Sequence, residues 1–287
     1  MTEIGRNTEG HVVSLPGRPD VTVTLSWGAA TDTGRRRKHN EDSFLAQAPI
    51  FVVADGMGGH ASGDVASAAV VARLAEATGD FVDTAAIEAG LRAATADIML
   101  ADDELQIGVG TTATGAAMTL QFNDPYWAVF NIGDSRVYSF ERNELTQVTV
   151  DHSVVQELVD AGLIDAADAE SHPDSNIITR AVGFDAEPMP DYWMIPIKIG
   201  LRMLLCSDGL TKEVNHERLR QHLAAGLSAK ETASALIDAA LDAGGRDNVT
   251  AIVVDVVASS GPFEFDTIPG GNTVIGKVAG PPETPAK

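Results

Sequence analysis

The stretch IFVVADGMGGHASG, from Ile50 to Gly63, joins an apolar run to an acidic residue and then to a series of glycines. The apolar residues 50–54 predict a buried strand, and Asp55 stands directly after them. Four glycines follow within eight positions, where the backbone is expected to turn sharply or to approach another group closely. A strand that ends on a carboxylate indicates that a positively charged group lies at this edge. An ordinary strand, a turn and the start of a helix, with no bound group, would have the same sequence pattern.

Strand patterns dominate the rest of the chain. Runs rich in β-branched and aromatic residues predict strands over 21–27, 50–54, 111–122, 126–132, 136–140, 192–199, 201–207 and 249–257. Apolar residues at helical spacing predict helices over 64–77 and 84–104. Two capping boxes predict later helices: Ser153 with Gln156, ending near Gly162, and Ser228 with Glu231, ending near Gly244.

Several of these strands are only a few residues apart, which favours antiparallel hairpins over long crossovers. The sequence therefore predicts an α+β fold, with two antiparallel β-sheets packed face to face and α-helices on their outer faces. Residues 1–18 show no clear pattern, and we expect them to be loosely ordered. Ten of the last 27 residues are Gly or Pro, so we expect a flexible tail over 259–287 and one folded domain over 19–258.

The composition excludes several classes of partner. A formal net charge of −21 is opposite to the basic footprint that nucleic acids and anionic membranes require. No apolar stretch is long enough to span a bilayer, and the N-terminus lacks the apolar core of a signal peptide. The single cysteine, Cys206, excludes an internal disulfide framework and suits a reducing compartment. We therefore expect a cytoplasmic protein with no nucleic-acid or membrane partner.

Four further segments repeat the pattern around Asp55, with an acid and small residues at the edge of an apolar run. They are RRRKHNEDSF (35–44), NIGDSRVYSF (131–140), LLCSDGL (204–210) and GGRDNVTAIVV (244–254), and their acids are Asp42, Asp134, Asp208 and Asp247. Each alone is a common turn sequence. Antiparallel strands that share one sheet end would bring all five carboxylates together, and such a cluster of oxygen ligands favours Mg²⁺ or Mn²⁺ over Zn²⁺.

Taken in order, these segments resemble the metal-dependent PP2C (PPM) family of protein serine/threonine phosphatases, and in particular its bacterial branch. The resemblance runs from about residue 22 to 256 and also includes GTTATGAA (110–117), VDHSVVQELVDAGLI (150–164) and ITRAVG (178–183). It implies a β-sandwich flanked by helices, with a two-metal centre at one sheet edge. A cysteine-based phosphatase is disfavoured, because Lys212 stands where that chemistry places an arginine after Cys206.

The resemblance also implies a role for individual residues. Asp55 would bridge both Mn²⁺ or Mg²⁺ ions, the carbonyl of Gly56 would bind one of them, and Arg37 would bind the phosphate. The remaining ligands would be Asp208 and Asp247 at the first ion, Glu41 and Asp42 near the second, and Asp134 at a weaker third ion.

The expected function is hydrolysis of phosphoserine and phosphothreonine on proteins by a water that bridges the two ions. The partners would be phosphorylated substrates of serine/threonine kinases, and we expect a monomer. A pseudophosphatase of weak activity, or a regulator that binds phosphoproteins without turnover, is the alternative.

One position departs from the family pattern. Many members have aspartate four residues after the acid of SDG, where it helps to hold the third ion, and this chain has Lys212 there. A protonated lysine does not bind a metal ion, so we expect two firmly bound ions and a third that is absent or needs high Mn²⁺.

Overall fold

The computed structural model describes residues 1–58, 62–102, 108–260 and 277–278. The strands are β1 (Glu3–Gly5), β2 (Thr8–Leu15), β3 (Arg18–Asp32), β4 (Asp42–Gln47), β5 (Ile50–Met57), β6 (Gly110–Thr111), β7 (Ala113–Gln121), β8 (Asp124–Ile132), β9 (Arg136–Glu141), β10 (Glu144–Gln147), β11 (Asp191–Pro196), β12 (Arg202–Cys206), β13 (Val249–Ser260) and β14 (Lys277–Val278). The helices are α1 (Ser62–Leu74), α2 (Thr84–Asp102), α3 (Val154–Asp160), the 3₁₀ helix η1 (Ala166–Ser171), α4 (Asp208–Thr211), α5 (His216–Leu223) and α6 (Ala229–Ala243).

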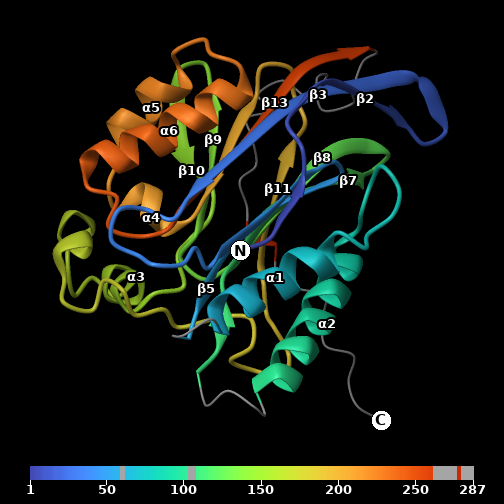
Figure 1. Ribbon diagram of the computed structural model, residues 1–287. Coiled ribbons are helices and arrows are strands. Elements are labelled where there is room, and N and C mark those ends of the chain that lie inside the picture. Colours follow the sequence, from blue (N-terminus) through green and yellow to red (C-terminus); the bar gives the residue numbers. More distant parts are fainter. Residues whose placement is uncertain (59–61, 103–107, 261–276, 279–287) are drawn as a thin grey trace.

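The strands form two sheets. One has the order β1-β4-β5-β7-β8-β11-β14, with β6 beside β5, and the other has the order β10-β9-β12-β13-β3-β2. Neighbouring strands are antiparallel except for the parallel pair β1 and β4. The two sheets pack against each other, with α1 and α2 on one outer face and α5 and α6 on the other (Figure 1). The predicted α+β class, with two packed sheets and flanking helices, is confirmed.

Apolar side chains fill the three interfaces between the layers of helices and sheets. Between the sheets, the ring of Phe51 lies edge-on to Trp27 and Trp127, at centroid distances of 5.3 and 6.0 Å. A second cluster lies under α1 and α2, and a third under α5 and α6. Helix α6 lies so close to β3 that a Cβ on Gly28 would be 2.3 Å from the Cα of Lys230. None of the helices that the structure describes is long and apolar enough to cross a membrane.

The N-terminus differs from the prediction. Residues 1–18, expected to be loosely ordered, supply β1, which pairs with β4, and β2, which pairs with β3. Val13 and Leu15 of β2 are each only 2% exposed in the core between the sheets. The polar residues and the glycine of TEGHVVSL obscure its strand pattern, because only its second half alternates between buried and exposed positions.

The later helices follow their capping signals. Ser228 and Glu231 form the complete capping box of α6, and Gly244 ends the helix. Ser153 caps α3 by accepting the backbone N–H of Gln156, whereas the side chain of Gln156 bonds to Asp160. At the other end of the chain, Ser259 and Ser260 belong to β13 and residues 277–278 to β14. The rest of the predicted tail lies outside the described residues.

Candidate metal centre

Strand ends from both sheets gather the predicted acids at one edge of the sandwich. Asp42 and Asp55 lie directly opposite each other on β4 and β5. Asp208 begins α4 two residues after the end of β12, and Asp247 stands two residues before the start of β13, which pairs with β12. Asp134 lies in the connection from β8 to β9. The five aspartates predicted from the sequence to form a cluster therefore lie at the same edge of the two sheets.

Asp42 ties the two sheets together. Its side chain is fully buried, and its Oδ2 accepts hydrogen bonds from Ser207 Oγ at 2.9 Å and Thr250 Oγ1 at 2.7 Å. Burial raises the pKa of Asp42 to about 7; the two hydroxyl groups oppose that shift, and the charges of Asp208 and Asp247 add to it. Its Oδ1 is buried and accepts no hydrogen bond from the described residues.

The other acids also raise one another's pKa values. Burial and then the charges of Asp42, Asp208, Asp134 and Asp247 raise the pKa of Asp55 well above its usual range. Burial and the charge of Asp208 likewise raise the pKa of Asp134 to about 7. Several carboxylates within one small volume repel one another unless a cation lies among them. The electrostatics therefore indicate a site built for positive charge.

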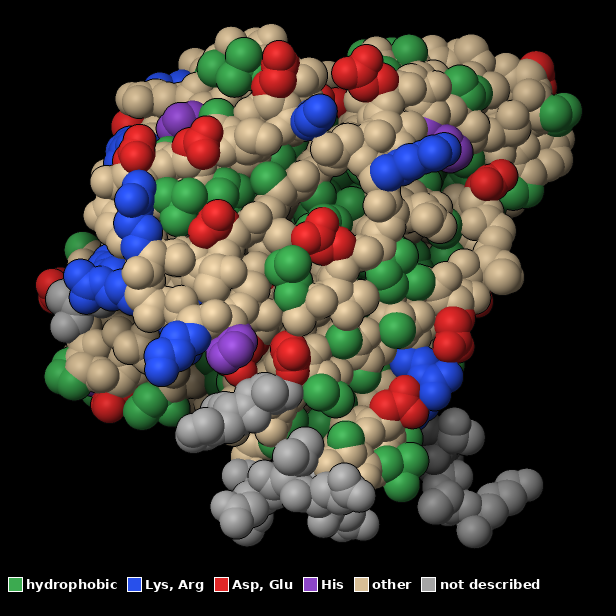
Figure 2. Space-filling view, viewed as in Figure 1, with side chains coloured by type: hydrophobic (Ala, Val, Ile, Leu, Met, Phe, Trp, Pro, Cys, Tyr) green, Lys and Arg blue, Asp and Glu red, His purple; other side chains and the backbone are tan. Residues whose placement is uncertain are grey.

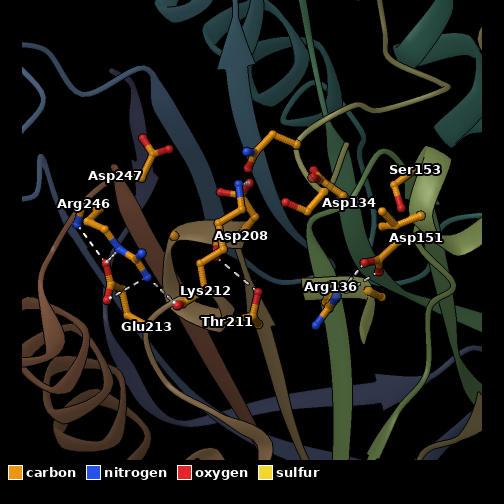
Figure 3. Close-up of a pocket in the computed structure, with 15 residues that line it drawn as sticks. Asp134, Arg136, Asp151, Ser153, Asp208, Thr211, Lys212, Glu213, Arg246 and Asp247 are labelled. Atoms are coloured by element: carbon orange, nitrogen blue, oxygen red, sulfur yellow. Dashed lines mark hydrogen bonds and ion pairs between the residues drawn. The ribbon is translucent and has the colours of Figure 1, made fainter. Parts of the chain in front are cut away.

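In the described part of the chain, two basic side chains bind acids of this cluster. The ammonium of Lys212 donates a hydrogen bond to Asp208 Oδ2 (Figure 3). Arg37 Nη2 donates one to Asp247 Oδ2 at 2.8 Å. Burial acts to lower the pKa of Lys212, but the charges of Asp208, Asp134 and Asp55 outweigh it and the pKa is raised. Within the described residues, no three His, Cys, Asp or Glu side chains already stand in metal-binding geometry.

The donor set fits a divalent cation. The side-chain donors are carboxylate oxygens, which Mg²⁺ and Mn²⁺ prefer. Asp42 Oδ1 and Asp208 Oδ1 are both buried and have no hydrogen-bond partner among the described residues, and such atoms are costly to leave without a partner. A Cβ on Gly56 would lie 2.1 Å from the carbonyl oxygen of Gly63, so only glycine fits at this point beside Asp55.

Asn248 is a positioning residue that the sequence did not single out. Its Oδ1 accepts the backbone N–H of Glu41 at 2.8 Å, and its Nδ2 donates to the carbonyls of Thr33 and His39 at 2.8 and 2.9 Å. The Glu41 carbonyl in turn accepts the backbone N–H of Gly56 at 3.2 Å. Asn248 thus holds the loop of Arg37 and Glu41 against the start of β13. Its place directly after Asp247 in the RDN motif is the only sequence signal for this role.

A cavity of about 540 Å³ opens beside the acids. Figure 3 shows Asp208 and Asp247 toward one side of it and Asp134 toward the other, next to Asp151 and Ser153. Further lining residues, among them Val155, Ala169 and Asn176, come from the segment that includes α3 and η1. Arg136 and Asp151 pair deeper in this wall, with Nη2 to Oδ2 at 2.7 Å. The cavity provides room for a chain segment next to the candidate metal centre.

Cys206 does not belong to this site. It is fully buried in β12, and burial raises the pKa of its thiol to about 12, far from the range of a reactive thiolate. The structure therefore supports the interpretation of Cys206 as a core residue.

Carboxylates gathered at one sheet edge, beside an arginine that can bind phosphate, are typical of metal-dependent phosphoester hydrolases. The protein phosphatase 2C family profile matches residues 32–243. The chain therefore belongs to the protein phosphatase 2C family.

Individual relatives agree with this assignment. The chain is 43% identical over 245 residues to the serine/threonine protein phosphatase PstP of Mycobacterium tuberculosis, covering 83% of this chain and 46% of that protein. It is 38% identical to the serine/threonine phosphatase stp of Listeria welshimeri, covering 78% of this chain and 93% of that protein. The chain thus spans about half of the mycobacterial relative and most of the listerial one.

A solved structure matches the fold closely. The catalytic domain of the serine/threonine protein phosphatase PstP, in complex with two manganese ions, superposes with a TM-score of 0.72 at 39% identity, covering 82% of this chain and 99% of that one. The likeness extends to the sandwich as a whole. The two ions are a property of that complex.

Proposed function

We propose that this chain hydrolyses phosphoserine and phosphothreonine esters on proteins, with two Mn²⁺ or Mg²⁺ ions at the sheet edge. The observation that carries the proposal is the set of acids with raised pKa values at one edge, with buried oxygens of Asp42 and Asp208 left without partners. Membership of the protein phosphatase 2C family and the two manganese ions of the similar PstP structure support it.

Each residue has a distinct part in this proposal. Asp55 would bridge the ions, the Gly56 carbonyl would bind one of them, and Asp208 and Asp247 would complete the first coordination sphere. Glu41 and Asp42 would act at the second ion, with Asp42 held in place by Ser207 and Thr250. When bound, the two ions supply the positive charge that activates a water nucleophile and stabilises the phosphoryl oxygens.

Arg37 would orient the phosphate. It lies in the loop between β3 and β4, its side chain is 51% exposed, and one of its amino groups binds Asp247. The remaining N–H groups of the planar guanidinium can donate two parallel hydrogen bonds to phosphoryl oxygens. An anchored but accessible arginine next to the metal ligands therefore positions the ester for in-line attack.

Further basic residues lie near the acid cluster. Arg35 is two residues before Arg37 in the same loop, and Arg246 directly precedes Asp247, the residue that Arg37 binds. In Figure 2, several Lys and Arg side chains gather at the left edge of the molecule, the side on which Figure 1 shows α3 and α4. Such a local group attracts an anionic phosphoprotein to a chain of charge −21.

The proposed substrates are proteins phosphorylated by serine/threonine kinases. We propose that the chain acts as a monomer in the cytoplasm; its single buried cysteine supports a reducing environment.

The direct test is hydrolysis of a phosphothreonine peptide in the presence of Mn²⁺, in EDTA, and after Mn²⁺ is restored. We expect turnover that vanishes in EDTA and returns with Mn²⁺. Asp55→Asn should abolish it, whereas Asp80→Asn, the same change at an exposed residue, should leave it unchanged. Full activity in EDTA would refute the metal mechanism, and peptide binding with Mn²⁺ but without turnover would favour a phosphoprotein-binding regulator.

A further inference from the structure

Lys212 stands at the boundary between the acid cluster and the cavity. It follows the single turn of α4, and its backbone N–H donates to the carbonyl of Asp208 at 2.9 Å. Residues four apart on a helical turn lie on the same face, so the side chain of Lys212 is directed back over Asp208. Figure 3 shows the side chain of Lys212 extending to the carboxylate of Asp208, and Asp134 pointing into the same cavity.

The two oxygens of Asp208 have different surroundings. Oδ2 accepts the hydrogen bond from the Lys212 ammonium, whereas Oδ1 is buried with no hydrogen-bond partner in the described part of the chain. One oxygen is therefore available to a metal ion, and the other is already bound to a cation of the chain itself. A second ion on the Oδ2 side would have to displace the ammonium or share the carboxylate with it.

Lys212 is more enclosed than Arg37, which among the described residues is the other basic residue that binds a carboxylate of this cluster. The side chain of Lys212 is 36% exposed and that of Arg37 is 51% exposed. Arg37 lies on a loop, whereas Lys212 directly follows α4, a helical turn that packs against β12 and β13. The Lys212 side chain therefore has less freedom to move than that of Arg37.

The charges of the site also favour two divalent ions. The acids assigned to it are Glu41, Asp42, Asp55, Asp134, Asp208 and Asp247. Two divalent ions balance four of their six negative charges, and Lys212 and Arg37, which bind Asp208 and Asp247, balance the other two. A third divalent ion would leave an excess of positive charge in a partly buried site, which is costly.

We propose that Lys212 is a built-in cation that occupies the Asp134–Asp208 end of the site, so that the chain binds two divalent ions where an acid at this position would allow three. The proposal rests on the proposed function, because it assumes that the aspartates hold divalent ions. In this proposal the ammonium of Lys212 takes the place of a third divalent ion and so limits the metal centre to two ions.

The test is a Mn²⁺ titration by isothermal calorimetry, with native mass spectrometry to count bound ions. The variants are Lys212→Asp, which adds a carboxylate, and Lys212→Met, which removes only the charge. Lys230→Asp makes the same charge change at an exposed residue at the start of α6 and serves as the control.

We expect two ions in the wild type and in Lys230→Asp, and a third ion in Lys212→Asp. Lys212→Met should bind Mn²⁺ about tenfold more tightly in its weakest site, because a nearby positive charge is removed. This neutral variant decides the question if Lys212→Asp does not fold, as judged by circular dichroism.

Three ions in the wild type would overturn the proposal. Two ions of unchanged affinity in both Lys212 variants would also overturn it. Hydrolysis of p-nitrophenyl phosphate by the wild type separates this failure from failure of the proposed function. If the wild type hydrolyses the ester with Mn²⁺ but the variants show no change in ion number or affinity, only the role of Lys212 is wrong. If it neither binds Mn²⁺ nor hydrolyses the ester, both proposals are wrong.

Discussion

Arg37 combines a structural contact with a proposed role in substrate binding. Its hydrogen bond to Asp247 fixes one amino group at 2.8 Å, while half of the side chain is exposed toward solvent. A guanidinium offers two parallel donors to a phosphoryl group, and an ammonium does not. The identity of this residue should therefore matter more than its charge.

We predict that Arg37→Ala and Arg37→Lys each lower kcat/KM for a phosphopeptide by roughly 10- to 100-fold, about the loss expected when a charge-assisted bidentate contact is removed. The melting temperature should change little, since the residue is exposed. Steady-state kinetics with Arg218→Lys, on the exposed side of α5, provide the matched control. Full activity in Arg37→Lys would show that a single positive charge is sufficient.

Asp42 and Asp134 make the stability of the metal-free protein depend on pH. The pKa of each is raised from 3.8 to about 7 in the folded chain, first by burial. A carboxyl group with a raised folded pKa favours folding while it is protonated, and this contribution is lost as pH rises through the folded pKa. The loss therefore falls between about pH 4 and about pH 8.

We predict that in EDTA the melting temperature decreases as the pH is raised from about 5 to about 8. Asp42→Asn should weaken this dependence, because the amide carries no charge to bury, and excess Mn²⁺ should raise the melting temperature most at the high-pH end. Differential scanning fluorimetry measures all three. A melting temperature in EDTA that rises over this range would contradict the assignment of these acids as buried and mutually repelling.

At the scale of elements, the junction of β5 and α1 decides where Asp55 lies. Gly56 and Gly63 face each other across it, and a Cβ on Gly56 would lie 2.1 Å from the Gly63 carbonyl oxygen and 2.7 Å from that of Glu41. Both of these atoms are backbone, so relief requires the strand, the loop or the helix to move. Any such movement displaces the neighbouring Asp55.

We predict that Gly56→Ala lowers activity at least about 100-fold and destabilises the fold by about 2 kcal/mol or more, as overpacking at a rigid contact does. Gly90→Ala is the matched control. The nearest atom to an added Cβ there is a terminal methyl of the flexible Leu74 side chain, at 2.9 Å, and the nearest backbone atom is 3.5 Å away, an ordinary contact. Alanine is also the better helix former. Activity and chemical denaturation are measured for both. Equal effects at the two positions would show that the close backbone contact is not what positions Asp55.

Elements with strong periodicity or a capping signal were predictable from the sequence, and elements defined by distant partners were not. The capping box of Ser228 and Glu231 predicted the start of α6. Strand β4 has no alternating pattern, because five of its six residues are buried. The meeting of the five aspartates followed from their shared place at strand ends. The hydroxyls that hold Asp42 could not be predicted, since Ser207 and Thr250 are 165 and 208 residues away in the sequence.

At the scale of the whole molecule, the N-terminal strands belong to the sandwich. β1 extends one sheet and β2 extends the other, and Val13 and Leu15 enter the core between them. After Ser260, the described residues add to the sheets only the two-residue strand β14, which pairs with β11. The two ends should therefore respond differently to truncation.

We predict that deletion of residues 1–16 costs several kcal/mol of stability, since two buried aliphatic side chains and a long strand are lost, each such side chain contributing about 1.5–3 kcal/mol. Deletion of 261–287 should leave activity on a short phosphopeptide within about twofold. Thermal melts and kinetics of both truncated proteins test this pair. If removing the C-terminal segment causes the greater loss of stability, that segment has a larger structural role than the sequence predicts.

The proposed function depends on two divalent ions held by the aspartates at the edge of the sandwich. Anomalous diffraction from a Mn²⁺-soaked crystal of the full chain tests this most directly. We expect two strong peaks on either side of Asp55, about 3.5–4 Å apart, with Asp208 and Asp247 bound to one of them. A single peak, or peaks that do not contact Asp55, would contradict it.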